Sequence, residues 1–322
     1  MFDQPLKQST DRPSDFKNRF LIPGLKLAGF AVVIYLIARY FRANVARINL
    51  PSWSEVNLSA VGIFIAALIA IQLLYSLLWM IFVRGFGYKI SLSDTFVSTY
   101  YPVLTKYLPG KGWFQVGRIY LLKKAGVEAE AGLTINILEQ IVVIYAGLLI
   151  STPLLIQLTR PMFVILILLV STVLTISFLF YQSFFTKLFA QFGRLIKLNR
   201  TISLNQKIRP QIILLYMILY IANWILWGLL FKLGIDILDA GNSLSIGLAA
   251  GSFAFSSIIG FIIPIAPAGL GIREGALLVF LEKQVNPAAL FNATIGIRLC
   301  TIIGEIIMFL IALLLKARTK ND

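Results

Sequence analysis

The sequence predicts an all-α membrane protein that crosses the bilayer several times. Hydrophobic residues form 58% of the 322-residue chain and charged residues only 13%, and the mean hydropathy is +0.85, a composition far from that of soluble domains. Several apolar runs reach the ~20 residues that a transmembrane helix needs. Two further stretches are broken by proline and glycine, as in helices that enter a membrane and turn back. We therefore expect about eight apolar segments, about six full transmembrane helices and two re-entrant helical hairpins.

The formal net charge of +15 fits cytoplasmic loops rich in Lys and Arg that face anionic lipid headgroups. We therefore expect a multi-pass protein of the plasma membrane, with membrane lipids as partners and no contact with nucleic acid. The chain has no histidine and one cysteine, Cys300, so disulfides within the chain are excluded and zinc, haem or iron–sulfur sites are not expected. Nucleophilic catalysis by Cys–His or Ser–His pairs is excluded for want of histidine. No cofactor is predicted.

The first half of the chain is predicted to contain two spans, a broken hairpin and a third span. A polar, basic segment at 1–19 forms a cytoplasmic tail, and a single transmembrane domain covers 20–315, with its first repeat at 20–151. The segments of this repeat are, in order, 25–41, 57–83, the hairpin halves 91–105 and 113–124, and 131–150. The first segment leads into Arg39 and Arg42 without a small-residue cleavage site, so we interpret it as an uncleaved anchor.

The second repeat, 161–315, has the same order of segments. These are 162–181, 211–231, the hairpin halves 244–263 and 272–283, and 289–315, followed by a basic cytoplasmic tail at 316–322. A basic linker without acids, 182–209, joins the first two and carries apolar side chains on one helical face. This pattern is typical of an amphipathic helix on an anionic membrane surface. A cytoplasmic loop packed on the bundle is the alternative.

The basic clusters decide between two topologies. If 244–263 crosses the membrane completely, the basic C-terminal tail lies outside, against the positive-inside rule. If 244–283 is instead a hairpin that enters from outside, both termini are cytoplasmic. The two halves then have opposite orientations, as in the inverted-topology repeats of transporters, whose broken helices meet at the substrate site near the bilayer midplane. We adopt the second topology.

The two predicted hairpins share one sequence build. They are KYLPGKGWFQVGRIYLLKKAGV at 106–127 and FIIPIAPAGLGIREGALLVFLEKQV at 261–285. In each of them proline and glycine break a helix, and a short helix with an arginine follows. The predicted tip residues are Pro109, Gly110, Gly112, Pro267, Gly269 and Gly271. Glycine at such tips permits tight turns and a close approach of the backbone to a ligand.

Few polar side chains lie at membrane depth in this arrangement. The candidate substrate-binding residues are Lys111, Gln115, Arg118, Glu139, Arg273, Glu274, Arg298 and Glu305. The cationic members would hold a phosphate or another anionic headgroup, helped by half-helix N-termini, and the acids would balance the site or carry protons. In the alternative interpretation, these charges only neutralise one another and fix the hairpins. Asn223, Trp224 and Trp227, near the middle of a span, are predicted to serve packing.

The hairpin stretches resemble the paired signatures of the lysylphosphatidylglycerol synthase transmembrane region, also described as the flippase-like or UPF0104-type membrane protein family. Leu-Pro-Gly-Lys and Gly-Leu-Gly-x-Arg-Glu-Gly elements carry the resemblance, which covers about residues 20–315. Ala268 departs from the glycine of the family's pattern, and its methyl group would slightly alter the approach of the backbone to a ligand. The resemblance implies a role in moving aminoacylated phospholipid between leaflets or in polyprenyl-phosphate sugar metabolism.

The residues and the resemblance together predict a flippase-like translocator of an anionic phospholipid, an aminoacyl-phospholipid or a polyprenyl-phosphate-linked substrate. The cytoplasmic synthase domain of the best-known family members is not expected, since few residues follow the last span. One alternative is an integral-membrane enzyme of lipid or lipid-linked sugar metabolism that uses Glu139, Glu274 or Glu305 as a base. It is less favoured because the sequence has no Asp-x-Asp metal motif. The other is a scaffold for a separately encoded synthase or glycosyltransferase, and a homo-oligomer stays open in each case.

Overall fold

The computed structural model describes residues 35, 39, 42, 57–108, 112–180, 210–239, 241–263 and 266–318. Every regular element within these residues is a helix, which confirms the all-α class. The predicted N-terminal tail, the linker helix at 182–209, the tip residues Pro109 and Gly110, and all but two residues of the span at 25–41 lie outside the described residues.

The described helices fall into two series with the same order of elements. The first series is α2 (Leu58–Gly85), α3 (Leu92–Tyr100), the short 3-10 helix η1 (Val103–Tyr107), α4 (Trp113–Lys124) and α5 (Ala129–Ile150). The second series is α9 (Pro210–Leu238), α10 (Ile246–Ile262), the 3-10 turn η2 (Pro267–Gly269), α11 (Ile272–Leu281) and α12 (Pro287–Arg318). Between them stand α6 (Thr152–Leu158) and α7 (Pro161–Phe180). Each series is a long helix, a broken pair of short helices and another long helix.

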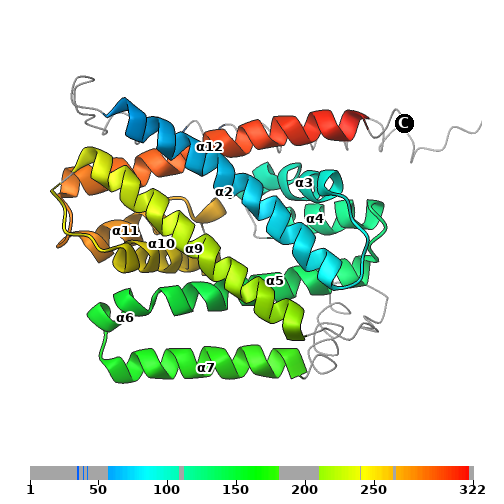
Figure 1. The fold of residues 1–322 in the computed structure, drawn as a ribbon, viewed down its shortest axis with the longest axis horizontal. Coiled ribbons are helices and arrows are strands. Elements are labelled where there is room, and N and C mark those ends of the chain that lie inside the picture. Colours follow the sequence, from blue (N-terminus) through cyan, green and yellow to red (C-terminus); the bar gives the residue numbers. More distant parts are fainter. Residues whose placement is uncertain are drawn as a thin grey trace, which may run out of the picture.

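Corresponding helices of the two series run in opposite directions. Gly85 at the end of α2 packs on Ile212 at the start of α9, whereas Gly234 near the end of α9 packs on Phe64 near the start of α2. Figure 1 shows the same relation for α5 and α12, which run between the two ends of the molecule in opposite senses. This antiparallel arrangement is what an inverted repeat requires.

Local sequence signals account for where the short helices begin. Ser91 caps α3, because its Oγ accepts a hydrogen bond from the Asp94 amide (3.0 Å). Ser245 caps α10 in the same way through the Leu248 amide (3.2 Å). Each cap satisfies one of the amides that a helix N-terminus leaves unpaired, and such caps contribute about 1 kcal/mol. The broken pairs therefore start at defined positions.

Four of the described helices are long and apolar enough to cross a membrane: α2, α5, α9 and α12. The segments Pro161–Val173 of α7 and Ile246–Ile262 of α10 are shorter apolar helices. Helix α6 is an element that we did not predict. It follows α5 directly because Ser151 ends α5 and Pro153, which is tolerated only in the first turn of a helix, opens a new one.

Helix α10 packs closely on α9, as its many small residues predict. A Cβ atom at Gly228 of α9 would overlap with Cα and Cβ of Ala250 and would lie 2.8 Å from the Ala250 backbone nitrogen. One turn away, the rings of Trp227 and Phe253 stack with centroids 5.4 Å apart. Ten of the residues in α10 are buried, so the helix lies in the interior of the bundle and not at its surface.

Candidate functional site

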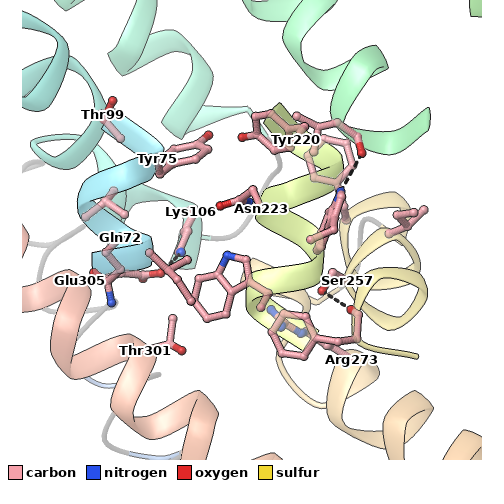
Figure 2. A pocket seen from close by; sticks show the side chains of 18 of the residues that line it. Gln72, Tyr75, Thr99, Lys106, Tyr220, Asn223, Ser257, Arg273, Thr301 and Glu305 are labelled. Atoms are coloured by element: carbon pink, nitrogen blue, oxygen red, sulfur yellow. Dashed lines mark hydrogen bonds and ion pairs between the residues drawn. The ribbon is translucent and has the colours of Figure 1, made fainter. Parts of the chain in front are cut away.

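A cavity of about 330 Å³ lies between the two broken pairs, in the middle of the bundle. Its lining comes from α2, α3, η1, α4 and α5 of the first series and from α9, α10, α11 and α12 of the second. Figure 2 shows this cavity, with Lys106 and Glu305 at one side, Arg273 and Thr301 at another, and Tyr75 and Tyr220 opposite. Its volume is near the lower limit of ligand pockets, which run from ~300 to ~1,000 Å³.

The tip of the second broken pair has backbone geometry that glycine favours. The φ angles are 71° at Gly269 and 83° at Gly271, and Ala268 has a φ of 52°, in the left-handed region. Gly269 is confined further, because a Cβ atom there would lie 3.0 Å from the Cα of Gly260 in α10. The departure of Ala268 from glycine therefore falls on a strained position, since a non-glycine residue in this region costs about 1–2 kcal/mol.

Glu305 of α12 connects this helix to the first broken pair. Its carboxylate accepts from Lys106 Nζ (2.5 Å) and from the Tyr107 hydroxyl (2.9 Å), both in η1. Lys106 lines the cavity, and the predicted site residue Lys111 lies outside the described residues. Both donors of this carboxylate therefore come from the segment just before the predicted tip.

Arg298, two turns before Glu305 on α12, connects the same helix to the second broken pair. Its Nη2 donates to the backbone oxygen of Ala268 (2.7 Å), and its Nε lies 3.3 Å from Glu274 Oε1. The other oxygen of Glu274 accepts from the Gly271 amide (2.7 Å). Glu274 thus holds the first turn of α11, where a carboxylate is also favoured by the helix dipole.

Arg273 differs from Arg118 and Arg298 because the described residues give it no carboxylate partner. In the described part of the chain, no acidic oxygen lies within 4.0 Å of its guanidinium. The group instead lies over the Phe253 ring, with the guanidinium carbon 4.0 Å from the ring centre. Arg273 is half-buried and lines the cavity. It is the side chain best placed to receive an anion.

The charged side chains that line the cavity are three cations, Lys106, Arg273 and Arg298, and one carboxylate, Glu305. The wall therefore carries an excess of positive charge, although Arg298 and Lys106 each have an acidic neighbour. A phosphate or another anion would be attracted to this wall.

Arg118 and Glu139 form a second charged pair, which does not line the cavity but lies directly behind its wall, where Arg118 Nη1 donates to the Tyr75 hydroxyl (3.5 Å). The two side chains are completely buried and bind each other through both carboxylate oxygens. The Tyr216 hydroxyl donates to Glu139 (3.0 Å), and the Arg118 guanidinium carbon lies 3.5 Å from the centre of the Trp79 ring. Gln115, one turn earlier on α4, does not line the cavity either. The arginines on the short helices of the two hairpins, Arg118 and Arg273, therefore have different environments.

Several residues that we did not select line the cavity. They are Gln72, Tyr75, Thr99, Tyr100, Gln140, Tyr220, Asn223, Ser257 and Thr301. The signal that points to the central ones is the i,i+3 spacing of polar residues within apolar spans, at 72 and 75 and at 220 and 223. Trp224 donates to the Val143 backbone oxygen (3.0 Å) and Trp227 stacks on Phe253, contacts that fit the packing role predicted for them, whereas Asn223, also predicted to serve packing, has a buried side-chain oxygen with no partner in the described residues. Both tryptophans line the cavity as well.

The comparison with protein families matches the model of the lysylphosphatidylglycerol synthase transmembrane region over residues 24–308. A comparison with curated proteins returned no match. The family match covers both broken pairs and the cavity between them. The resemblance seen in the two hairpin sequences is thereby confirmed. The chain belongs to the family of lysylphosphatidylglycerol synthase transmembrane regions, and is a membrane protein related to lipid or flippase-like function.

Proposed function

We propose that this protein moves a lipid with a phosphate-bearing headgroup between the two leaflets, as a flippase-like translocator. The observation that carries this proposal is the cavity between the two broken pairs, with Arg273 on its wall and no carboxylate within ion-pair distance of it in the described residues. An unpaired charge inside a membrane is costly, at ~2.5–3.5 kcal/mol on insertion scales, and such a residue usually marks a substrate pathway.

The proposal divides the lipid between two environments. The headgroup enters the cavity, where Arg273 receives its phosphate and Lys106 and Arg298 add positive charge. The acyl chains stay in the bilayer, so they need no protein enclosure. The two broken pairs face each other across the cavity from opposite repeats, and their alternate opening would expose the headgroup site to one leaflet and then to the other.

Replacement of Arg273 by methionine is expected to lower the transport rate about 10–100-fold, because the headgroup loses a charge-assisted hydrogen bond. Methionine keeps the length and the apolar contact with Phe253 that Arg273 makes. The assay follows transbilayer movement of fluorescent phosphatidylglycerol in vesicles that contain the purified protein. Lys283→Met is the matched control, since Lys283 is exposed beyond the end of α11.

Two results would contradict the proposal. One is an unchanged transport rate in a folded Arg273→Met protein, judged by its thermal unfolding in detergent. The other is a chemically altered lipid in the same vesicles, detected by mass spectrometry, which would favour the enzyme alternative.

The orientation in the membrane is part of the proposal. The end of α2, the end of α4 and the end of α12 lie at one end of the molecule (Figure 1), and this end carries Arg84, Lys123, Lys124 and Lys316. The positive-inside rule assigns it to the cytoplasm, together with the C-terminus. The opposite end contains the starts of α10 and α12.

Cysteine labelling tests this orientation directly. In a Cys300→Ala background, Glu282→Cys lies after α11 and Ala317→Cys lies near the end of α12, and both positions are exposed. A membrane-impermeant thiol reagent added to intact cells is expected to label the first variant and to leave the second unlabelled until the cells are opened. Labelling of Ala317→Cys in intact cells would contradict the orientation.

A further inference from the structure

The side chains that line the end of the cavity away from Arg273 are polar and uncharged, and the Arg118–Glu139 pair lies directly behind them, in contact with Tyr75 and Gln140. Figure 2 shows Tyr75, Tyr220 and Asn223 with their polar ends turned toward one another, opposite Arg273 and Thr301. Helix α2 supplies Gln72 and Tyr75, one turn apart, and α9 supplies Tyr220 and Asn223 with the same spacing. The rings of Tyr75 and Tyr220 meet edge to face with centroids 6.4 Å apart.

Two carboxamides on the cavity wall have unsatisfied hydrogen-bonding groups. Asn223 lies beside the two tyrosines, and Gln72 lies on the side of Glu305 (Figure 2). Gln72 and Asn223 are each 4% exposed. The side-chain oxygen of Asn223 and both polar atoms of Gln72 are buried without a hydrogen-bond partner in the described residues. Leaving such a group unsatisfied costs about 1–3 kcal/mol. Buried polar atoms of this kind in a native cavity call for a partner, and a ligand hydroxyl, which both donates and accepts, suits them.

Aromatic and aliphatic side chains form much of the remaining cavity wall. Phe114, Trp224 and Trp227 line the cavity beside the carboxamides and the tyrosines. An apolar and aromatic wall with a few convergent polar groups is the usual composition of a site for a small neutral group. Tyr and Trp contribute both an apolar face and a hydrogen-bonding tip.

In the described residues, an ammonium group would find no deep carboxylate without a cationic neighbour. Each deep acid already has a cationic neighbour: Glu305 has Lys106, Glu274 has Arg298 and Glu139 has Arg118. A headgroup that carries an aminoacyl ammonium would bring a further cation into a cavity with an excess of positive charge. Like charges repel strongly where the surroundings exclude water.

We propose that the cavity selects a phosphodiester lipid whose headgroup ends in a neutral, hydroxyl-bearing group, a glycerol or a sugar. Arg273 and its cationic neighbours hold the phosphodiester, and Gln72, Asn223 and the two tyrosines bind the hydroxyls. This inference rests on the proposed function, because it assigns the headgroup to the same cavity. The inference narrows the substrate to one class of headgroup. Lipids whose headgroup carries an ammonium group, and lipids whose headgroup is only a phosphate, should bind less tightly.

Binding of short-chain lipids in detergent tests the selection, with tryptophan fluorescence as the readout because Trp224 and Trp227 line the cavity. The probes are dihexanoyl phosphatidylglycerol, a short-chain polyprenyl-phosphate glucose, dihexanoyl phosphatidic acid and dihexanoyl lysylphosphatidylglycerol. We expect at least one of the first two to bind about tenfold or more tightly than the last two. Phosphatidic acid lacks the hydroxyls that the site binds, and lysylphosphatidylglycerol brings additional positive charge into a cavity that already has an excess of it. Whichever of the first two probes binds more tightly shows whether the site prefers a glycerol or a sugar headgroup.

Asn223→Leu is the variant that isolates the neutral end of the cavity. It is expected to remove most of the roughly tenfold preference for the hydroxyl-bearing probes and to leave the affinity for phosphatidic acid within about threefold, because the phosphate contacts remain. Asn136→Leu is the matched control. Asn136 is also buried with an unpartnered side-chain atom, Nδ2, but it does not line the cavity.

The outcomes separate this inference from the proposed function. Phosphatidic acid or lysylphosphatidylglycerol that binds as tightly as both hydroxyl-bearing probes overturns the inference, and so does a preference that survives Asn223→Leu. Transport of phosphatidylglycerol that depends on Arg273 would still support the proposed function in those cases. Failure of all four probes to bind, together with vesicles that show no transport, would overturn both.

Discussion

Replacement of Glu139 by glutamine is expected to lower the free energy of unfolding by about 3–5 kcal/mol, the cost of removing one partner from a buried ion pair. The change leaves the Arg118 guanidinium without a counter-charge in a completely buried position. It also alters the acceptor of the Tyr216 hydroxyl. Unfolding in mixed micelles, followed by circular dichroism, measures the effect. Glu128→Gln, an exposed change at the start of α5, is the control and should lower stability by less than about 1 kcal/mol, because it removes only a favourable contact with the helix dipole.

A double variant tells whether the pair serves stability alone. Arg118→Met combined with Glu139→Leu replaces both charges by apolar groups, and such replacements of a buried pair are often neutral or stabilising. We therefore expect the double variant to recover most of the stability lost in Glu139→Gln. Transport by the double variant would show that Arg118 is not needed in the headgroup site. An equally stable Glu139→Gln protein would contradict this account of the pair.

Gly228→Ala is expected to destabilise the bundle by about 1–3 kcal/mol or more, as overpacking of a tight contact does. The new methyl group would overlap with Cα and Cβ of Ala250 in α10, and backbone cannot move aside without shifting the whole helix. Since α9 and α10 both line the cavity, a shift of α10 should also weaken lipid binding.

The control for this change is Gly62→Ala in α2, where an added Cβ atom would meet nothing within 4 Å. Alanine favours a helix over glycine by roughly 0.5–1 kcal/mol, so this variant should be as stable as the parent or slightly more stable. Comparison of the two midpoints of unfolding in the same detergent gives the test. Equal midpoints would show that α9 and α10 are not in close contact.

Local sequence signals were enough to predict most of the helices. Helix α4 begins at Trp113 and ends at Lys124, at the predicted bounds, because glycine precedes it and two lysines close it. Helix α9 continues to Leu238, beyond the predicted end at Phe231. The reason is that Lys232 and Asp236 pair one turn apart (2.8 Å) and so extend the helix through polar residues. Helix α6 was not predicted, because Pro153, which lies in its first turn, usually indicates the end of helical structure.

The site was harder to predict because its contacts join residues far apart in the sequence. The sequence places one arginine on the short helix of each hairpin, Arg118 and Arg273. In the described residues only Arg118 of these two has a carboxylate partner, supplied by Glu139 on the next helix. Such a pair forms only if α4 and α5 each turn the charged side chain toward the other helix, and the periodicity of the sequence does not determine this orientation. The part of the cavity wall formed by Gln72, Tyr75, Tyr220 and Asn223 was equally hard to predict, because α2 and α9 are far apart in the sequence and come together only in the folded bundle.

The contacts of helix α12 limit how this fold can vary between relatives. From two positions on one face it contacts both broken pairs, through Glu305 to Lys106 and Tyr107 and through Arg298 to Ala268 and Glu274. A hairpin transplanted from a relative would therefore arrive without its matching face of α12. The two hairpins and that face of α12 therefore have to match one another. Chimeras that exchange all three together should fold, and chimeras that exchange a single hairpin should not.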